Sequence, residues 1–313
     1  MKKAFLQLHL SVILAGWTGI FGKLISLSPG LIVFWRIVIA GALLWTWTRL
    51  TGKLEAVTKR DRIGIMGVGA LLMIQWTLFY AAIKASNVSI GVVTFSSIGF
   101  FTALLEPLMT GSRVKLKEIA FSLLTIIGIS LIFHFDTRYR LGIFFGLASA
   151  AAAAVLAVFF RIYKAKYSSV TVMNWQLAGG LTAALVLLPF YRWLMPAEPF
   201  IPTLFDAGCL VIFASFCTIG MYLLQIQSLE KISAFTVNLT YNLEPIYSII
   251  LAMIIFGEGS QLGASFYAGL GLIGLSVVLQ TLSVMKMQRR SAKLKRLKVE
   301  ASEKADNGTA AGS

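Results

Sequence analysis

Apolar stretches separated by short polar segments fill almost the whole chain. A helix needs about 20 mostly apolar residues to cross the hydrocarbon core of a bilayer, because every backbone polar group must be satisfied inside the segment. The pattern therefore predicts an all-α integral membrane protein with ten transmembrane helices. The ten predicted spans are 5–25, 30–50, 63–85, 88–109, 119–135, 141–160, 170–190, 204–227, 232–256 and 262–285.

The first stretch follows a Met-Lys-Lys start and could also be a signal peptide. We favour a transmembrane span, because the stretch runs into the second one without a convincing small-residue cleavage site. Its removal would also break the pairing of the two halves of the chain.

The last five spans repeat the first five. A shift of 146 residues brings Gly111 onto Gly257 and Gly128 onto Gly274. Matches of Leu and Ile between apolar helices arise by chance, whereas matched glycines at one fixed offset are a stronger signal. Because each unit has an odd number of spans, the second unit must be inverted in the membrane. Inverted repeats are typical of carriers that alternate access to a site near the bilayer midplane.

Composition and charge agree with a membrane protein. The chain is 58% hydrophobic, above the roughly 45–50% of ordinary soluble domains. Its 28 Lys and Arg give a formal net charge of +15. With the N-terminus inside, 22 of these 28 residues fall in the inner segments and the tail, so the positive-inside rule places both termini in the cytoplasm. The sorting by side indicates a multi-pass plasma (inner) membrane protein, not nucleic-acid binding.

The spans also set the expected domain boundaries. We expect a first five-helix repeat at 1–136, a second at 137–285, and a basic and then disordered cytoplasmic tail at 286–313. The basic cluster from Arg289 to Lys298 is expected to lie on the lipid bilayer, where each basic residue near anionic headgroups contributes about 1 kcal/mol.

Two stretches carry a family resemblance. Pro245 to Glu258 (PIYSIILAMIIFGE) resembles the repeat ending of the EamA-domain carriers of the drug/metabolite transporter superfamily, and Gly99 to Ser112 (GFFTALLEPLMTGS) resembles a degraded copy. Gly99 stands where the motif has Pro, and Ser112 where it has Glu. Lys23, which closes AGWTGIFGK, and Arg36 are further matches.

The resemblance implies a fold and a class of function. It implies two inverted five-helix units, with spans one to four and six to nine around a central cavity and spans five and ten outside. It also implies a small-molecule substrate. Export of an amino acid or a related metabolite is the leading interpretation, and export of amphipathic drugs is the alternative.

Polar and aromatic residues recur at helical spacing on one face of spans three, eight and nine. An amide that faced lipid would cost several kcal/mol, so these residues need partners. They either line a substrate cavity or join helices through hydrogen bonds, and for the stripes taken together we favour the cavity. The candidate cavity residues are Gln75, Trp76, Phe79 and Tyr80 in span three, Thr218, Tyr222 and Gln225 in span eight, Asn238, Tyr241 and Asn242 in span nine, and Trp17 in span one.

Two charged residues inside predicted spans complete the candidate site. Glu244 lies near the middle of span nine, where a carboxylate costs at least a few kcal/mol unless it is paired or neutral. It is a candidate for proton coupling or for binding a substrate amine. The alternative is a neutral acid bonded to backbone groups freed at Pro245, the predicted hinge. Arg36 contacts the substrate, pairs with an acid, or extends to the nearby membrane surface.

Other functions fit the sequence less well. The chain has two His and lacks an HExxH motif, a Walker glycine loop and a carboxylate pair at helical spacing, so we expect no enzyme, no catalytic residue, no metal site and no cofactor. A channel would need a selectivity ring, which nothing in the sequence suggests. A non-transporting membrane sensor stays open. The sequence predicts a secondary transporter for a zwitterionic or uncharged solute that works by alternating access.

Overall fold

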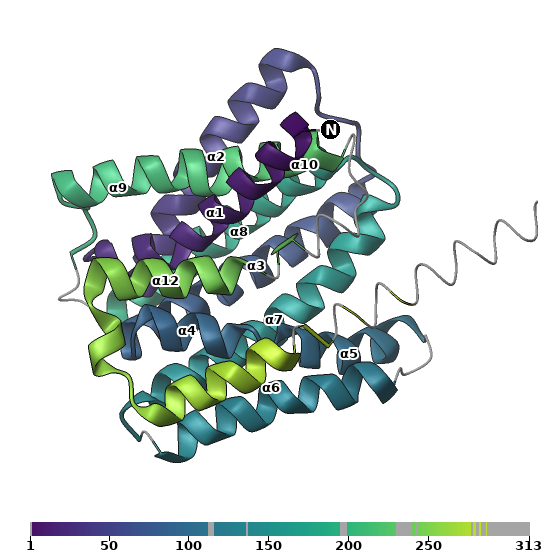
Figure 1. Cartoon of the computed structure of the whole chain (residues 1–313). Helices are drawn as coiled ribbons and strands as arrows, with labels where there is room; N and C mark the ends of the chain where they lie inside the picture. The colour runs from purple at the N-terminus through teal and green to yellow at the C-terminus, as the bar shows by residue number, and fades with distance from the viewer. Residues whose placement is uncertain are drawn as a thin grey trace, which may run out of the picture.

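The computed structural model describes residues 2–111, 116–135, 137–194, 199–229, 240–241, 243–276, 278–279, 282 and 286, and these residues form helices without a strand (Figure 1). The elements are α1 (Lys2–Leu24), α2 (Pro29–Thr51), α3 (Lys59–Ala85), α4 (Val88–Phe95), α5 (Ile98–Thr110), α6 (Leu116–Phe135), η1 (Thr137–Tyr139), α7 (Arg140–Lys164), α8 (Ser169–Leu194), α9 (Leu204–Ala214), η2 (Ser215–Gly220), α10 (Met221–Leu229), α12 (Glu244–Phe256) and η3 (Glu258–Gln261). A further apolar helix covers Ala264–Ser276.

Within the described residues, seven helices are long and apolar enough to cross a membrane, and three shorter apolar helices accompany them. The seven are Lys2–Leu24, Pro29–Thr51, Lys59–Ala85, Val88–Thr110, Thr137–Lys164, Ser169–Trp193 and Leu204–Gln225, and the shorter ones are Leu123–Ile132, Glu244–Phe256 and Ala264–Ser276. The all-α class with apolar spans is therefore confirmed. The count of ten spans in two inverted repeats stays a prediction.

Two predicted spans are interrupted. The span predicted at 88–109 consists of α4 and α5, which are separated at Ser96 and Ser97. The hydroxyls of these serines donate to the carbonyls of Val92 and Thr94 at 3.0 and 2.7 Å, and such bonds compete with the helical ladder. The span predicted at 204–227 contains η2, a turn of π-helix between α9 and α10. Such π-turns are rare and occur frequently at functional sites.

Helix α3 lies in the centre of the bundle and packs most extensively on α7 and α8. Its contact with α8 brings the two backbones together. A Cβ atom added at Gly69 would lie 1.9 Å from the carbonyl oxygen of Gln176, and one added at Gly179 would lie 2.1 Å from that of Met66. Only glycine fits at such positions, so these residues set the distance between α3 and α8.

The offset found in the sequence recurs in the helix bounds. Helices α5 and α12 each have 13 residues, and both their first and last residues differ by 146. Each helix ends at a glycine in the left-handed conformation, Gly111 with φ 66° and Gly257 with φ 64°. Their N–H groups donate to the carbonyls of Pro107 and Met253, which again lie 146 residues apart. The two segments thus fold alike, and the inversion between the repeats stays a prediction.

Helix α6 pairs with the helix Ala264–Ser276. Thr125 Oγ1 donates to Ser276 Oγ at 2.8 Å. Gly128 and Gly269 approach so closely that a Cβ on either would lie 2.6 Å from the other's carbonyl oxygen. These are spans five and ten, which the family resemblance places outside the cavity, and α6 lies at the lower edge of the bundle in Figure 1.

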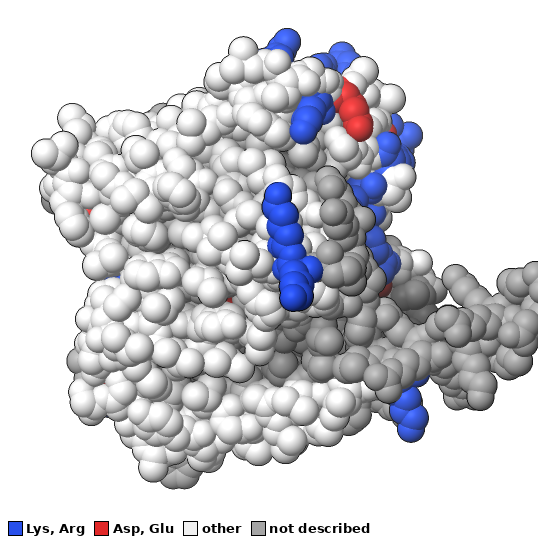
Figure 2. Space-filling view, turned by 45° about the horizontal axis from the view of Figure 1, so that its top comes forward, with Lys and Arg blue, Asp and Glu red and all other residues white. Residues whose placement is uncertain are grey.

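Lys and Arg gather on one side of the molecule. In Figure 2 the blue side chains lie in the right-hand part of the face in view, and the left-hand part is almost free of them. Ion pairs link α5 to α7 through Glu106 and Arg161, and α3 to the α7–α8 connection through Asp61 and Lys166. This asymmetry is the one expected from the positive-inside rule, while the orientation of the termini stays a prediction.

Candidate functional site

A buried arginine is the centre of the polar residues inside the bundle. Arg36 is 3% exposed and lies about 10 Å along α2 from the helix start at Pro29. Its Nε donates to Thr218 Oγ1 at 3.0 Å, and its Nη1 donates to the Tyr80 hydroxyl at 2.5 Å. The side chain points into the bundle, so the conformation that extends to the membrane surface is wrong. Two polar partners from other helices hold it inside.

Two aromatic rings contact the guanidinium group. Its carbon lies 3.8 Å from the ring centroid of Trp76 and 4.3 Å from that of Phe213. A cation over an aromatic face is attracted by the negative face of the ring. Trp76 and Tyr80 are four residues apart on α3, and this spacing lets both reach the same arginine. We call Arg36, Trp76, Tyr80, Phe213 and Thr218 the arginine cluster.

Local structure on both sides orients the cluster. Thr218 lies in η2, and its hydroxyl also donates to the Phe213 carbonyl, five residues earlier, at 3.3 Å. The hydroxyl proton is thereby used, and the oxygen accepts from Arg36. On the other side Gly22 of α1 leaves room for the Tyr80 ring, because a Cβ there would lie 2.6 Å from a ring carbon. Helices α1, α2, α3 and the π-turn therefore meet at one point.

Gln75 makes a different kind of contact. Its Nε2 donates to Ser149 Oγ of α7 at 2.9 Å, and the Ser149 hydroxyl donates back to the Gln75 carbonyl at 3.0 Å. Both residues are buried. Reciprocal bonds of this kind join α3 to α7, which is the alternative to cavity lining that the sequence left open.

We expect Gln75→Leu to lower the thermal stability of the detergent-solubilised protein, because Ser149 loses its amide partner in an apolar interface. Hydrogen bonds between membrane helices contribute about 0.6 kcal/mol on average. A double-mutant cycle of Gln75→Leu and Ser149→Ala should therefore give a coupling energy of about that size. Transport rates should stay near wild type. A large loss of transport in Gln75→Leu, without one in Ser149→Ala, would place Gln75 in the substrate cavity instead.

The other described candidates of spans one, three and eight are buried or half-buried. Phe79 is 8% exposed, and its ring contacts that of Tyr80 at 5.6 Å between centroids. Trp17 is half-buried on α1. Tyr222 is buried and Gln225 is half-buried on α10. Among the described residues, no hydrogen bond joins Tyr222 or Gln225 to the arginine cluster, so these two remain candidates by position in the sequence only.

Only part of predicted span nine belongs to the described residues. Asn238 and Asn242, two members of its polar stripe, lie outside them. Tyr241 is half-buried, and its hydroxyl donates to Ser11 Oγ of α1 at 3.2 Å. The contact places this part of the stripe against the middle of α1, 11 residues before Gly22.

Glu244 is the first residue of α12, and Pro245 lies in the first turn of that helix. A proline in a first turn breaks no helical hydrogen bond, because the N–H groups there have no intrahelical partner. Thr240 and Tyr241, before this turn, are helical as well, and the kink and the hinge expected at Pro245 stay predictions. The Glu244 carboxylate forms no hydrogen bond or ion pair with another described residue. Its backbone carbonyl faces Gly16 of α1, where a Cβ would lie 3.6 Å away.

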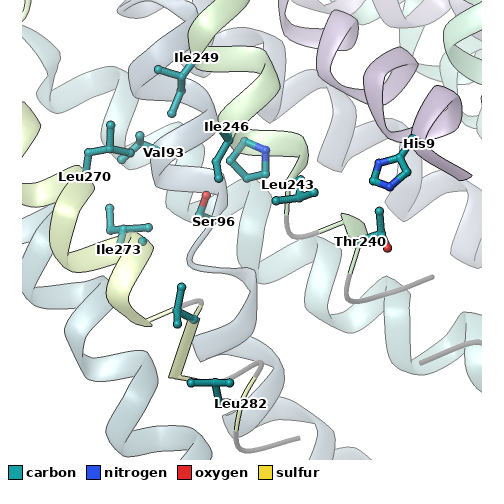
Figure 3. A pocket seen from close by; sticks show the side chains of 13 residues that line it. His9, Val93, Ser96, Thr240, Leu243, Ile246, Ile249, Leu270, Ile273 and Leu282 are labelled. Carbon is teal, nitrogen blue, oxygen red and sulfur yellow. The ribbon is translucent and has the colours of Figure 1, made fainter. Parts of the chain in front are cut away.

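A separate apolar cavity of about 520 Å³ opens between α1, α4, α12 and the last helices (Figure 3). Of the candidate residues that the structure describes, only Pro245 contributes to its lining. His9, Ser96 and Thr240 supply the polar side chains, and Figure 3 shows them around an otherwise aliphatic wall. The sequence did not predict this cavity, since its aliphatic lining residues look like any membrane helix.

A buried carboxylate lies at the end of the bundle where α1 and α12 finish. Glu258 is 0% exposed and accepts four hydrogen bonds. Lys23 Nζ donates at 2.8 Å, the N–H groups of Val88 and Ser89 donate at 3.0 and 2.9 Å, and the Ser89 hydroxyl donates at 2.7 Å. We call these four residues the Glu258 network. Glu258 and Lys23 both belong to the motifs quoted for the family resemblance, which is the signal that could have linked them.

Asp206 forms a second such contact at the same end. It is 1% exposed and accepts from the N–H and the hydroxyl of Ser26 at 2.8 and 2.6 Å. Thr203, the N-cap of α9, donates to it at 2.8 Å. The connection between α1 and α2 is thereby fixed to the start of α9.

The apolar spans, the arginine cluster in the bundle and the buried hydrogen bonds of Glu258 and Asp206 at one end describe an integral membrane protein. A polar site enclosed by transmembrane helices is expected of the transporter class. The sequence profile of the EamA-like transporter family matches residues 2–134 and 140–280, so the chain belongs to this family. The resemblance identified from the two motifs is thereby confirmed, and with it the membrane transporter class.

Two individual comparisons agree with the family. The uncharacterized inner membrane transporter YicL of Salmonella typhimurium (strain LT2) is 24% identical over 305 residues, which cover 92% of this chain and 98% of that protein. A solved chain described only as the crystal structure of a protein superimposes with a TM-score of 0.59 at 18% identity, over 89% of this chain and 98% of its own. The latter likeness concerns the fold alone.

Proposed function

We propose that this protein is a secondary transporter that moves a small metabolite across the inner membrane, with export as the direction. Its membership of the EamA-like transporter family carries the proposal. The relative described as an inner membrane transporter supports the location. The charge asymmetry in Figure 2 supports cytoplasmic termini. The 146-residue offset between α5 and α12 supports two repeats that alternate access to a central site.

The proposed cargo is an amino acid or a related zwitterionic or uncharged solute. Arg36 has neutral hydroxyl partners, and Glu244 has no polar partner among the described residues. Helix α1 contacts the surroundings of both residues, since Gly22 faces the Tyr80 ring of the arginine cluster and Gly16 faces the backbone carbonyl of Glu244. These glycines are six residues apart, which is about 9 Å along a helix. A cation on α2 and a carboxylic acid at the start of α12, whose surroundings both contact α1, suit a solute with both charges.

The apolar cavity favours a second cargo class. Its volume of about 520 Å³ and its aliphatic lining suit the body of an amphipathic compound, with His9 and Ser96 as polar contacts. An exporter of amphipathic drugs is therefore the alternative function.

Counterflow into proteoliposomes tests the proposal. Purified protein would be reconstituted with an internal pool of one amino acid, and uptake of the same labelled amino acid would be followed. A carrier accumulates label with saturable kinetics and loses this accumulation when the internal pool is omitted. Amphipathic dyes tested in the same vesicles separate the two cargo classes. Vesicles that exchange neither class of compound would favour the non-transporting sensor.

We expect Glu244→Gln to lower amino-acid exchange about tenfold, the size expected when a charge-assisted hydrogen bond of 1.5 kcal/mol is lost. If the carboxylate binds the amine of the cargo, wild-type exchange should fall as the pH is lowered and Glu244 is protonated. The variant should lack this part of the pH profile. Glu106→Gln, which removes the acid that pairs with Arg161, serves as the control. An unchanged rate and pH profile in Glu244→Gln would eliminate both proton coupling and amine binding.

A further inference from the structure

Arg36 carries a buried positive charge without an acidic partner in the part of the chain that the structure describes. The salt bridges of these residues involve other acids, namely Glu258 with Lys23, Glu106 with Arg161, and Asp61 with Lys166. Asp206 is occupied by Ser26 and Thr203. Lys23, Arg161 and Lys166 each have a carboxylate partner, whereas Arg36 has none among the described residues.

Neutral partners compensate such a charge only in part. Removing a guanidinium ion from water costs several kcal/mol, and an uncompensated buried charge is strongly unfavourable. The bonds to Thr218 and Tyr80 and the contact with the ring of Trp76 each offset a share of this cost. An anion in the plane of the guanidinium would complete the charge balance, and a site that needs an anion from outside is a binding site.

The geometry selects the shape of that anion. The rings of Trp76 and Phe213 lie against the guanidinium, so the N–H edge is the direction from which an anion can approach. A planar carboxylate matches the planar fork of an arginine. The Tyr80 hydroxyl, 2.5 Å from Nη1, lies beside this edge.

Access and an irregular backbone turn also point to a ligand site. Arg36, Tyr80 and Thr218 are buried, whereas Trp76 is half-buried, so the cluster is least covered on the Trp76 side. Thr218 is held by a π-turn, a local irregularity that recurs at functional sites. From these observations we propose that Arg36 binds a carboxylate group of the transported solute. The inference rests on the proposed transport function and adds the chemical class of the cargo: a small molecule with a free carboxylate.

Matched pairs of probes test this assignment. L-threonine, L-leucine and L-phenylalanine would each be compared with the corresponding carboxamide, which keeps the ammonium and the side chain but removes the carboxylate. Thermal-shift titration of the purified protein gives the apparent affinity, and inhibition of counterflow in proteoliposomes gives a second one. We expect wild-type protein to prefer at least one acid over its amide by about tenfold or more, the size of one charge-assisted bond.

Variants then assign the preference to one residue. Arg36→Gln should remove the preference for the acid, so that the acid and its amide bind with similar affinities. Arg36→Lys keeps the charge without the planar fork and should retain part of the preference. Arg49→Gln is the matched control, because Arg49 lies on the same helix over the ring of Trp45 but is exposed. It should behave as wild type.

The outcomes separate the two levels of the proposal. If wild-type vesicles exchange acid and amide equally well, or if Arg36→Gln keeps the preference, transport stands and the role of Arg36 is wrong. If potassium chloride alone gives the full stabilisation and the amino acids do not compete with it, the site binds an inorganic anion and the proposal is overturned. If no probe binds and none is exchanged, the proposed cargo fails together with the inference. Should Arg36→Gln not fold, the wild-type comparison and Arg36→Lys still decide.

Discussion

Gly69→Ala should prevent α3 and α8 from packing, and we expect little or no folded protein to be recovered in detergent. The added Cβ would lie 1.9 Å from the carbonyl oxygen and 2.7 Å from the carbonyl carbon of Gln176. Both are backbone atoms, so no side-chain rotation can relieve the clash, and the helices must separate along one of the most extensive contacts of the bundle. Overpacking costs about 1–3 kcal/mol where side chains can adjust, and a rigid backbone contact should exceed that range.

Gly67→Ala provides the control for this prediction. Gly67 lies two residues earlier on α3, is exposed, and has no atom within 4 Å of its would-be Cβ. Because alanine favours helix more than glycine by about 1 kcal/mol, this variant should be as stable as wild type or slightly more so. Size-exclusion profiles and thermal unfolding in detergent would measure both variants. Folded Gly69→Ala protein with a wild-type melting temperature would show that α3 and α8 do not pack as described.

Glu258→Ala should destabilise the protein by about 3 kcal/mol or more, because it leaves Lys23 and the N–H groups of Val88 and Ser89 without their shared acceptor. Glu258→Gln keeps the size and one acceptor oxygen and should cost less. Both effects would be read from the unfolding midpoint in a denaturant such as sodium dodecyl sulfate, added to detergent-solubilised protein.

The same carboxylate should make stability depend on pH. Burial raises the pKa of Glu258, but the hydrogen bonds from Lys23, Ser89 and Val88 outweigh burial and hold the pKa below its ordinary value of 4.5. A group with a lowered folded-state pKa stabilises the protein fully above the unfolded-state value, and this contribution is lost as the pH falls through the folded-state pKa. Wild-type stability should therefore decrease below about pH 4.5, and Glu258→Gln should lack this decrease.

Glu55→Gln is the control for both measurements. Glu55 also accepts a backbone N–H, that of Ser168 at 2.8 Å, but it is exposed. Exposed polar contacts contribute about 1 kcal/mol or less, so the variant should be close to wild type. Equal losses in Glu258→Ala and Glu55→Gln would contradict the assignment of a buried network at Glu258.

The Glu258 network also bears on the proposed transport cycle. It ties the end of α1 to the start of α4 and to the segment after α12, while Asp206 ties the α1–α2 connection to α9. Under alternating access, the two ends of a carrier open in turn. Such a cycle must break the buried hydrogen bonds that close one end. Variants at Glu258 should therefore alter exchange rates as well as stability.

The sequence alone determined the class of protein and several local structures. Length and apolarity specify the spans, because hydrocarbon satisfies no backbone polar group. The matched Gly111 and Gly257 specified where α5 and α12 end, since each stands in the left-handed conformation that glycine adopts without strain. The spacing of Trp76 and Tyr80 placed both on one face of α3, and the two motifs indicated the family.

Only the tertiary structure decided what these residues contact. Arg36 meets Tyr80 and Thr218 across 44 and 182 residues of sequence, and no local pattern encodes such distances. Phe213 was missed because one more phenylalanine in an apolar helix carries no signal, and its role follows from α9 crossing α2. Gln75 bonds to Ser149 because α7 happens to lie beside that face of α3. Helical periodicity specifies which face a side chain occupies, whereas packing between helices distant in sequence specifies its partner.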